Sequence, residues 1–154
     1  MSKTSWTVYL SGEIHTDWRE QIMSAAAAKQ LPVNFVSPVT VHADSDDCGA
    51  VILGEEEKSF WRDNKGGKIN AIRTRTLIGQ SDIVVVRFGD KYRQWNAAFD
   101  AGYAAALGKP VITLRDDALT HAMKEVDGAA MATATEPGQV VAILDYVISG
   151  RLER

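Results

Sequence analysis

The sequence predicts a single α/β domain, a three-layer fold in which helices cover both faces of a five-stranded, mainly parallel sheet. Strand-like and helix-like segments alternate along the chain, and this alternation implies parallel strands joined by right-handed crossovers. Asp82 to Phe88 is a continuous apolar run, typical of a strand that is buried on both faces. A chain of 154 residues with 45% hydrophobic side chains is large enough for one core. One domain spanning residues 1–154 is therefore expected.

The first part of the chain reads as strand, helix and strand. Thr7 to Ser11 is a short β-rich run ended by Gly12, and the polar and apolar residues from Asp17 to Leu31 recur at helical spacing. Asp17, with Glu20 three residues later, resembles a capping box, so the helix is expected to begin there. Val33 to Val36 is expected to be the second strand.

The segment from Ser37 to about Trp61 is expected to be a long acidic loop, such as a mobile lid, because it shows no sustained period. Part of it fits the first, third, fifth, sixth and twelfth positions of an EF-hand frame (Asp44, Asp46, Cys48, Gly49 and Glu55). Cysteine is a poor calcium ligand, and the preceding residues read as extended chain instead of a helix. One cysteine and one histidine also fall short of a zinc site. No metal and no cofactor are expected.

The second half of the chain continues the alternation. A basic helical pattern is followed by the buried strand, by an alanine-rich helix, by two further strands and by a closing helix with an apolar stripe. The expected ranges are Trp61 to Gly79, Asp82 to Phe88, Ala97 to Gly108, Pro110 to Leu114, Ala129 to Thr133 and Pro137 to Leu152.

Charge and cysteine content narrow the possible partners. The chain has 17 basic and 20 acidic residues with no basic block, which argues against a nucleic-acid polymer as partner. No apolar run approaches the roughly 18 residues needed to cross a bilayer, so no membrane partner is expected. Cys48 is the only cysteine and cannot form an internal disulfide. A cytoplasmic protein with a small-molecule ligand is expected.

Asp100 is the candidate catalytic residue. The carboxyl ends of parallel strands gather at one edge of a sheet, where ligands bind, and the alanine-rich helix starts from that edge. Asn96 and Asp100 are four residues apart and share one face of this helix, near the N-terminus, where the dipole favours an ionised carboxylate. A nucleophile needs that ionised state. The same dipole would also stabilise a surface charge without any catalytic role.

Further candidates follow the strands at the same edge. Tyr9, Ser11 and Gly12 end the first strand and should face Asp100. His15 could transfer a proton near neutral pH or simply face solvent. Arg87 could bind a phosphate or carboxylate or be paired within the protein. Tryptophans could stack on a nucleobase or cover the core (Trp18, Trp61 and Trp95). The candidate ligand-binding residues are Tyr9, Ser11, Gly12, His15, Arg87, Asp90, Trp95 and Asn96.

The run from Asp100 to Pro110, DAGYAAALGKP, resembles the hallmark of the nucleoside 2-deoxyribosyltransferase superfamily. Together with YLSGEIHTDWRE, NAIRTRTLI and VVRFGDKYRQWNAAFDAGYAAALGKP, the chain is similar to the YtoQ-like family within that superfamily. The resemblance implies a flavodoxin-like sheet and homo-oligomers. It also implies a carboxylate that attacks the anomeric carbon of a nucleoside, releases the base, and leaves a glycosyl-enzyme for water or a second base.

The chain departs from the transferase pattern in three places. Asp100 is one methylene shorter than the usual Glu, Gln94 stands where an acid is common, and the Arg73-Thr74 neighbourhood replaces an Asp. A displacement on the order of 1 Å can cost ~10²-fold in rate. The proton donor for the leaving base must then be another group, for which the candidates are Asp90, Glu13, Asp17 and His15.

Two classes of function follow from these departures. One is an N-glycosidic enzyme, either hydrolase or transferase, that acts on a nucleoside or nucleotide. The other is a non-catalytic binding module that kept the pocket and lost the pair of acids. A second acid within about 5 to 9 Å of Asp100 would favour the enzyme.

Overall fold

The computed structural model describes residues 3–154 as alternating strands and helices. The strands are short and the helices vary from one to six turns. In chain order the elements are β1 (Trp6–Gly12), α1 (Trp18–Ala28), β2 (Val33–Val36), α2 (His42–Leu53), α3 (Ser59–Gln80), β3 (Ile83–Phe88), α4 (Trp95–Ala106), β4 (Val111–Arg115), a 3₁₀ turn (Asp117–Leu119), α5 (Lys124–Ala129), β5 (Ala132–Ala134) and α6 (Pro137–Ser149).

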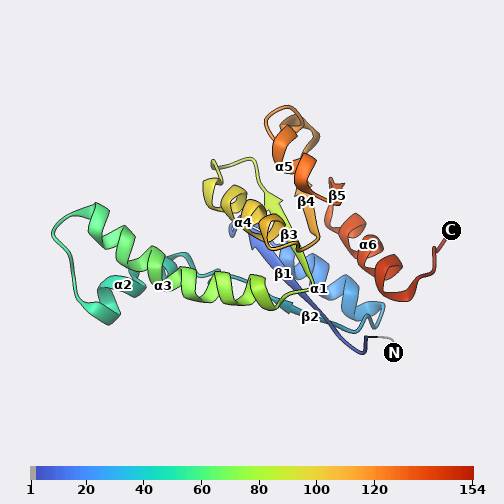
Figure 1. The fold of residues 1–154 in the computed structure, drawn as a ribbon, viewed down its shortest axis with the longest axis horizontal. Helices are drawn as coiled ribbons and strands as arrows, with labels where there is room; N and C mark the ends of the chain where they lie inside the picture. Colours follow the sequence, from blue (N-terminus) through green and yellow to red (C-terminus); the bar gives the residue numbers. More distant parts are fainter. Residues whose placement is uncertain (1–2) are drawn as a thin grey trace.

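The five strands form one sheet in the order β2-β1-β3-β4-β5, and every pair is parallel (Figure 1). This is the flavodoxin-like order, in which the strand order reverses between β1 and β3. The register places Ser11 beside Val86 and Gly12 beside Arg87, so the loops after β1 and β3 leave the sheet side by side. The predicted α/β fold with a parallel five-stranded sheet is confirmed.

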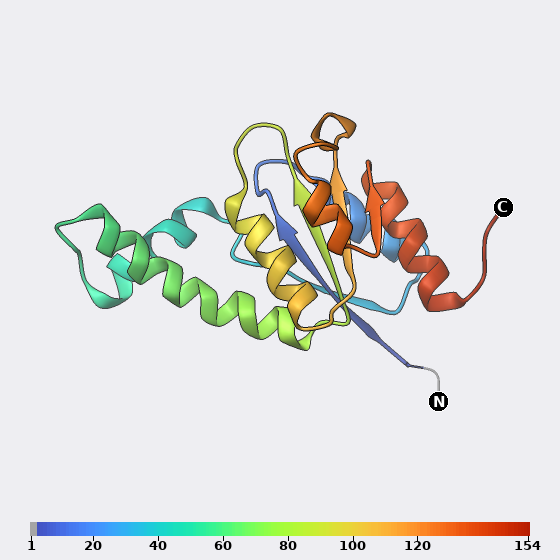
Figure 2. The same cartoon turned by 45° about the horizontal axis from the view of Figure 1, so that its top comes forward.

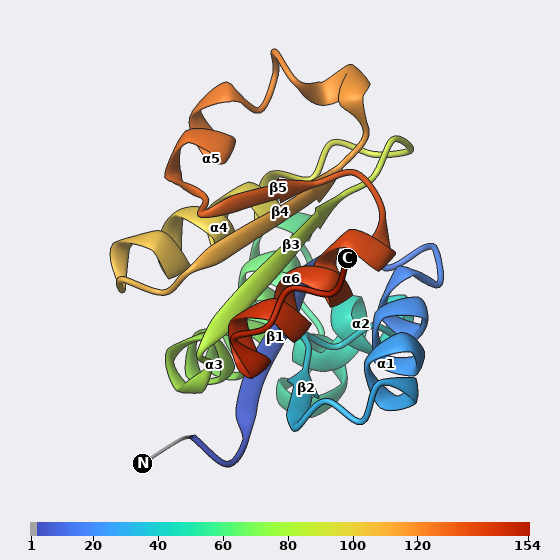
Figure 3. The same cartoon turned by 90° about the vertical axis from the view of Figure 1, so that its right-hand side faces the viewer.

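Helices cover the sheet on both faces, which gives three layers (Figure 3). The helices α1 and α6 bury their apolar stripes against one face, and α3, α4 and α5 cover the other. Side chains alternate along each strand, so neighbours in sequence belong to different cores. Val8 and Leu10 face α1, whereas Tyr9 faces α4. This alternation decides which strand residues can meet Asp100.

The predicted loop from Ser37 to Trp61 is wrong, because residues 42–53 form α2 and α3 begins at Ser59. The helix packs along α3, and a Cβ on Gly49 would lie 2.6 Å from the backbone nitrogen of Gly66. Such close packing of two backbones stabilises a helix whose own sequence has little amphipathic pattern. The EF-hand frame therefore lies mostly inside a helix instead of in a loop, as its position in α2 shows.

Other sequence expectations need smaller corrections. Asp17 precedes α1, but its side chain makes no capping hydrogen bond to the helix backbone and accepts one from the Gln21 side chain, 2.8 Å away. The predicted capping box is therefore wrong. The sequence analysis gave no residue range for α5, the short helix between β4 and β5, and β5 begins three residues later than expected. Within residues 3–154, no helix is both long enough and apolar enough to cross a membrane.

Candidate active site at the carboxyl edge of the sheet

The Asp100 carboxylate lies above the end of β1, where it accepts a hydrogen bond of 2.6 Å from the Ser11 hydroxyl. Asp100 is partly buried on the inner face of α4, while Ser11 is fully buried. Burial raises the pKa of Asp100, and the hydrogen bond from Ser11 opposes that change. Within residues 3–154 no cation forms a salt bridge with this carboxylate. Its negative charge is therefore poorly solvated and unpaired.

Tyr9 lies next to this carboxylate and has a hydroxyl without a partner. The side chain is 0% exposed, and the hydroxyl makes no hydrogen bond with any described residue. Burial and the negative charge of Asp100 raise the pKa of Tyr9 above its ordinary value, so the hydroxyl keeps its proton. An unpaired buried hydroxyl is costly, by about 1–3 kcal/mol. The Tyr9 hydroxyl is therefore an unsatisfied buried donor on the face of the sheet that α4 covers.

Arg19 holds the loop after β1 in place from the helix that follows it. The side chain is 5% exposed and donates to three backbone carbonyls, those of Leu10, Gly12 and Glu13, at 3.0, 3.1 and 2.7 Å. Its guanidinium also lies 4.5 Å from the ring centroid of Trp18. Burial lowers the pKa of Arg19 to about 10. Arg19 therefore orients the backbone around the site and is not free to bind a ligand.

Gly12 ends β1 in a conformation that requires glycine. Its φ is +112°, and a Cβ at this position would lie 2.1 Å from the carbonyl oxygen of Arg87. The next amide, that of Glu13, donates to the same carbonyl at 3.2 Å. The close approach joins the loop after β1 to the end of β3. Gly12 therefore shapes the site through its backbone.

Glu13 is committed to the turn after β1. Its carboxylate accepts from the backbone amides of His15 and Thr16 at 2.6 and 3.1 Å, and from the Thr16 hydroxyl. Burial acts to raise the pKa of Glu13, but these hydrogen bonds outweigh burial and hold it below the ordinary value. A carboxyl that stays ionised in this way is a poor proton donor. Glu13 is thus a weak candidate for the general acid.

Exposed rings gather where the loops after β1, β2 and β3 meet. The ring of His15 lies 4.9 Å from that of Tyr92 and 6.2 Å from that of His42, measured between centroids. Trp95, the first residue of α4, is 71% exposed, with the Arg93 guanidinium 5.8 Å from its ring centroid. These side chains form an aromatic rim at the carboxyl edge. Neither Tyr92 nor His42 was among the sequence candidates.

The remaining candidates do not surround Asp100. Arg87 pairs with Gly12 in register and, by strand alternation, lies on the face covered by α1 and α6, opposite to Asp100. Its Nε is buried and has no hydrogen-bond partner among the described residues. Asp90 and Asn96 are exposed, and the hydrogen bond that Asp100 accepts comes from Ser11 instead of Asn96. The structure therefore brings together Tyr9, Ser11, Gly12 and Asp100.

The other tryptophans are divided between core and surface. Trp18 is 3% exposed and donates from Nε1 to the Glu13 carbonyl at 2.8 Å, so it belongs to the core beneath the loop. Trp61 is 54% exposed at the start of α3, and Figure 2 shows this end of the helix far from the sheet edge. Of Trp18, Trp61 and Trp95, only Trp95 is both exposed and near the loops that carry the site.

Two arginines at this edge were not among the candidate ligand-binding residues, although the sequence analysis named Arg73 where an acid is replaced. Arg19 falls on the apolar face of α1 together with Ile22 and Ala26. A charged residue at such a position can be recognised from the helical spacing in the sequence. Arg73 donates from Nε to the Ser37 carbonyl at the end of β2, 3.1 Å away. Its positive charge acts to lower the pKa of Tyr9, against the larger effect of burial. That position depends on how α3 crosses the sheet, which the sequence does not reveal.

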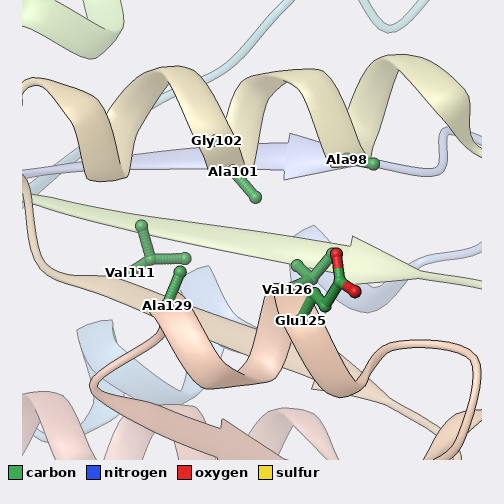
Figure 4. Close-up of a pocket in the computed structure, with 7 residues that line it drawn as sticks. All are labelled: Ala98, Ala101, Gly102, Val111, Glu125, Val126 and Ala129. Atoms are coloured by element: carbon green, nitrogen blue, oxygen red, sulfur yellow. The ribbon is translucent and has the colours of Figure 1, made fainter.

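An apolar hollow on the other side of α4 does not contain this site (Figure 4). Figure 4 shows Ala98 and Ala101 of α4 facing Val126 and Ala129 of α5. Glu125 is the one charged side chain in its lining, and Asp100 is absent from it. Ligand sites combine apolar walls with several convergent polar groups. The hollow has no such group of polar side chains and is best understood as a packing gap between two helices.

The fold and these contacts define a flavodoxin-like α/β protein with a partly buried carboxylate at the edge where ligands bind. A family model described as nucleoside 2-deoxyribosyltransferase YtoQ matches residues 9–148. The chain is 41% identical over 140 residues to the protein YtoQ of Bacillus subtilis (strain 168), covering 91% of this chain and 95% of that one. The chain belongs to the YtoQ family.

Two solved structures share the fold. A conserved protein from Enterococcus faecalis V583 aligns with a TM-score of 0.64 at 13% identity, covering 93% of this chain and 99% of the other. A 2-deoxyribosyltransferase from Bacillus psychrosaccharolyticus aligns with a TM-score of 0.51 at 16% identity, covering 88% and 90%. The resemblance to a deoxyribosyltransferase-like fold that the sequence analysis described is confirmed.

Proposed function

We propose that this protein cleaves or transfers the N-glycosidic bond of a nucleoside or nucleotide, with Asp100 as the nucleophile. The observation that carries the proposal is the Asp100 carboxylate, which is partly buried, hydrogen-bonded to Ser11 and not paired with a cation. A buried, unpaired negative charge favours a positively charged centre in front of it. The anomeric carbon acquires such a charge as the glycosidic bond breaks.

The reaction proceeds in two displacements. A carboxylate oxygen of Asp100 forms a bond to the anomeric carbon while the bond from that carbon to the base nitrogen breaks, and the leaving base takes a proton from solvent water. Water or a second base then attacks the same carbon and gives up a proton to solvent, while the bond to the Asp100 oxygen breaks and frees the carboxylate. Ser11 fixes the orientation of the carboxylate, and the Tyr9 hydroxyl supplies a hydrogen bond to the sugar or base.

A non-catalytic binding module is the second candidate, and one observation favours it. No acid that the sequence suggested as a proton donor is held beside Asp100. Glu13 is bound within its own turn, Asp17 accepts from Gln21, and Asp90 is exposed. Without a proton donor the site could bind a nucleoside and leave the glycosidic bond intact.

A mass-spectrometric screen for released base tests the two candidates. Ribo- and deoxyribonucleosides and their 5′-phosphates are incubated with the protein, with and without a second base as acceptor. We expect base release by the native protein and a loss on the order of 10⁴-fold in Asp100→Asn, which keeps the shape and removes the nucleophile. Gln94→Glu restores an acid where transferases commonly have one and should raise activity if the missing acid limits the rate.

The screen has clear opposing outcomes. Full turnover by Asp100→Asn would contradict the assignment of the nucleophile. Binding of nucleosides without release of base from any of them, even by Gln94→Glu, would support the binding module. Asp100→Glu tests whether the shorter side chain of Asp100 limits the approach of the carboxylate to the anomeric carbon. The longer side chain restores the transferase length, but it must fit beside the buried side chains of Tyr9 and Ser11.

A further inference from the structure

The helices α2 and α3 form an arm that projects from the sheet and carries apolar side chains at its end. We define the arm as residues 42–70, which extend away from the other helices in both views (Figures 1 and 2). Its end carries the arm patch, five large apolar side chains that are between 54% and 79% exposed: Val51, Ile52, Leu53, Phe60 and Trp61. Monomeric proteins rarely expose such a cluster, which marks an interaction surface.

The arm is held as a unit by contacts between its own two helices. Gly49 and Gly66 allow the two backbones to approach closely. Arg62 forms an ion pair of 2.7 Å with Asp47 across the helices, and Asn70 donates to the Ser45 carbonyl at 2.9 Å. These contacts are made on the inner sides of the helices, so the arm patch stays exposed. The apolar end is therefore a built surface and not a frayed helix terminus.

A second exposed surface lies where the second half of α3 approaches α4 on the body of the protein. This body patch consists of Ile72, Arg75, Trp95, Phe99 and Tyr103. The rings of Phe99 and Tyr103 are parallel with centroids 6.4 Å apart, and the Arg75 guanidinium lies 6.0 Å from the Tyr103 centroid. Ile72 and Trp95 are each 71% exposed. The body patch offers flat rings and aliphatic surface to a partner.

The charges around the two patches have opposite signs. The arm, residues 42–70, carries seven acidic and four basic side chains, whereas residues 71–109 carry three acidic and six basic ones. Several of these charges have no salt-bridge partner within residues 3–154, namely Asp44, Glu57 and Asp63 on the arm and Arg75, Lys91 and Arg93 near the body patch. Complementary charge of this kind steers association and fixes its register.

We propose that the protein forms a two-fold homodimer in which the arm patch of each copy packs on the body patch of the other. The helix α3 has 22 residues and is about 33 Å long. Two such helices packed antiparallel about a two-fold axis place the acidic residues 44–57 of each copy, which precede α3, near the basic second half of the other copy's α3. Each arm end then lies over the partner's α4, and both patches are covered by one self-complementary interface.

This proposal is independent of the proposed function and assigns surfaces to the homo-oligomer that the sequence analysis expected. The outer face of α4 takes part, as expected from its small and apolar residues, while the closing helix α6 does not. Trp95 begins α4 at the carboxyl edge, so the dimer also places each arm close to the other copy's site.

Light scattering at micromolar concentration tests the proposal, with single glutamate substitutions in each patch. We expect the native protein at twice the chain mass of 16.8 kDa, and monomers for Trp61→Glu, Ile52→Glu and Phe99→Glu. The matched control is Met131→Glu, because Met131 is 78% exposed but lies outside both patches. Unchanged circular dichroism of each variant establishes that it is folded, and the substitutions on three different helices keep the test decisive if one variant misfolds.

Disulfide trapping tests the pairing of the patches directly. In a Cys48→Ser background, Leu53→Cys combined with Phe99→Cys should give a disulfide-linked dimer on mild oxidation, whereas Leu53→Cys combined with Met131→Cys should not. A monomeric native protein would overturn the proposal. So would an oligomer whose mass is unchanged by all three glutamate substitutions, or equal trapping by both cysteine pairs.

Discussion

The carboxyl edge of the sheet and the arm use their side chains in opposite ways. At the edge, polar groups are buried: Ser11 is 0% exposed, Arg19 is 5% exposed, and Asp100 is partly buried. On the arm, apolar groups are exposed, with Val51 at 79% and Phe60 at 64%. Both arrangements cost stability in an isolated chain. The difference supports the two proposals, a polar ligand at the edge and an apolar partner surface on the arm.

The two regions also differ in how their backbones are held. The edge is fixed by the parallel sheet and by the three hydrogen bonds that Arg19 of α1 donates to the loop after β1. Its geometry therefore depends on the whole domain. The arm depends on two helices that pack on one another at glycines. Substitutions should therefore affect global stability at the edge and local stability on the arm.

The largest effect on stability is expected for Gly12→Ala. The new Cβ would lie 2.1 Å from the Arg87 carbonyl oxygen, and alanine strongly disfavours a φ of +112°. A loss of about 2–5 kcal/mol in the free energy of unfolding follows. Urea denaturation followed by tryptophan fluorescence measures it. Gly108→Ala is the matched control, since it also has positive φ but an open surrounding, and it should cost less. Equal losses would contradict the role of the close approach.

A second large effect is expected for Arg19→Met, which retains most of the side-chain volume and removes three hydrogen bonds to backbone carbonyls. The Glu13 carbonyl would keep its donor from Trp18, but the carbonyls of Leu10 and Gly12 would lose the guanidinium, at a cost of about 2–4 kcal/mol. The loop after β1 should also lose order, which amide hydrogen exchange of residues 12–17 would detect. A free energy of unfolding within about 0.5 kcal/mol of the native value would show that water replaces the hydrogen bonds of Arg19.

A smaller effect is expected on the arm for Gly49→Ala. The added methyl would approach the backbone of Gly66 to 2.6 Å and force α2 away from α3, at a cost of about 1–3 kcal/mol. Gly67→Ala is the control, because nothing lies within 4 Å of its added Cβ and alanine favours a helix by about 0.5–1 kcal/mol over glycine. Faster hydrogen exchange in residues 42–63, with exchange in β3 unchanged, is the expected signature. A uniform increase across the domain would contradict a locally stabilised arm.

The smallest effect, and one of opposite sign, is expected for Asp100→Asn. Burial raises the pKa of Asp100 in the folded state above the value of 3.8 that applies without burial, so the folded protein binds this proton more tightly than the unfolded chain. The stability contributed by the protonated form is present below pH 3.8 and is lost as pH rises through the raised pKa. Asparagine carries no charge, so the variant should be more stable at neutral pH, by about 0.5–2 kcal/mol.

Chemical denaturation at several pH values between 3 and 7 measures this difference. We expect the advantage of Asp100→Asn to vanish at the acidic end and to reach its full size at neutral pH. Asp90→Asn is the control, since Asp90 is exposed, and its stability should follow that of the native protein. A variant that is less stable than the native protein at pH 7 would mean that the ionised carboxylate stabilises the fold.

The sequence by itself determined the sheet and part of the site. Strands such as β3 are buried on both faces, so their apolar runs are continuous, and their alternation with amphipathic helices leaves few topologies. The carboxyl edge followed from that topology, which is why Asp100, Ser11, Tyr9 and Gly12 could be chosen as neighbours before the structure was known. Those residues are close because β1 and β3 end at the same edge, and α4, which follows β3, places Asp100 over the end of β1.

The tertiary structure decided what local pattern does not encode. The helix α2 exists because Gly49 meets Gly66 from another helix, a contact between residues 17 positions apart that leaves no periodic signal. Arg87 faces away from Asp100 because its place in the register gives it the opposite face of the sheet. The unpartnered Tyr9 hydroxyl and the exposed arm patch likewise depend on which surfaces other elements cover. Burial is a property of the whole packed chain, and so are the ligand and partner surfaces that burial leaves unsatisfied.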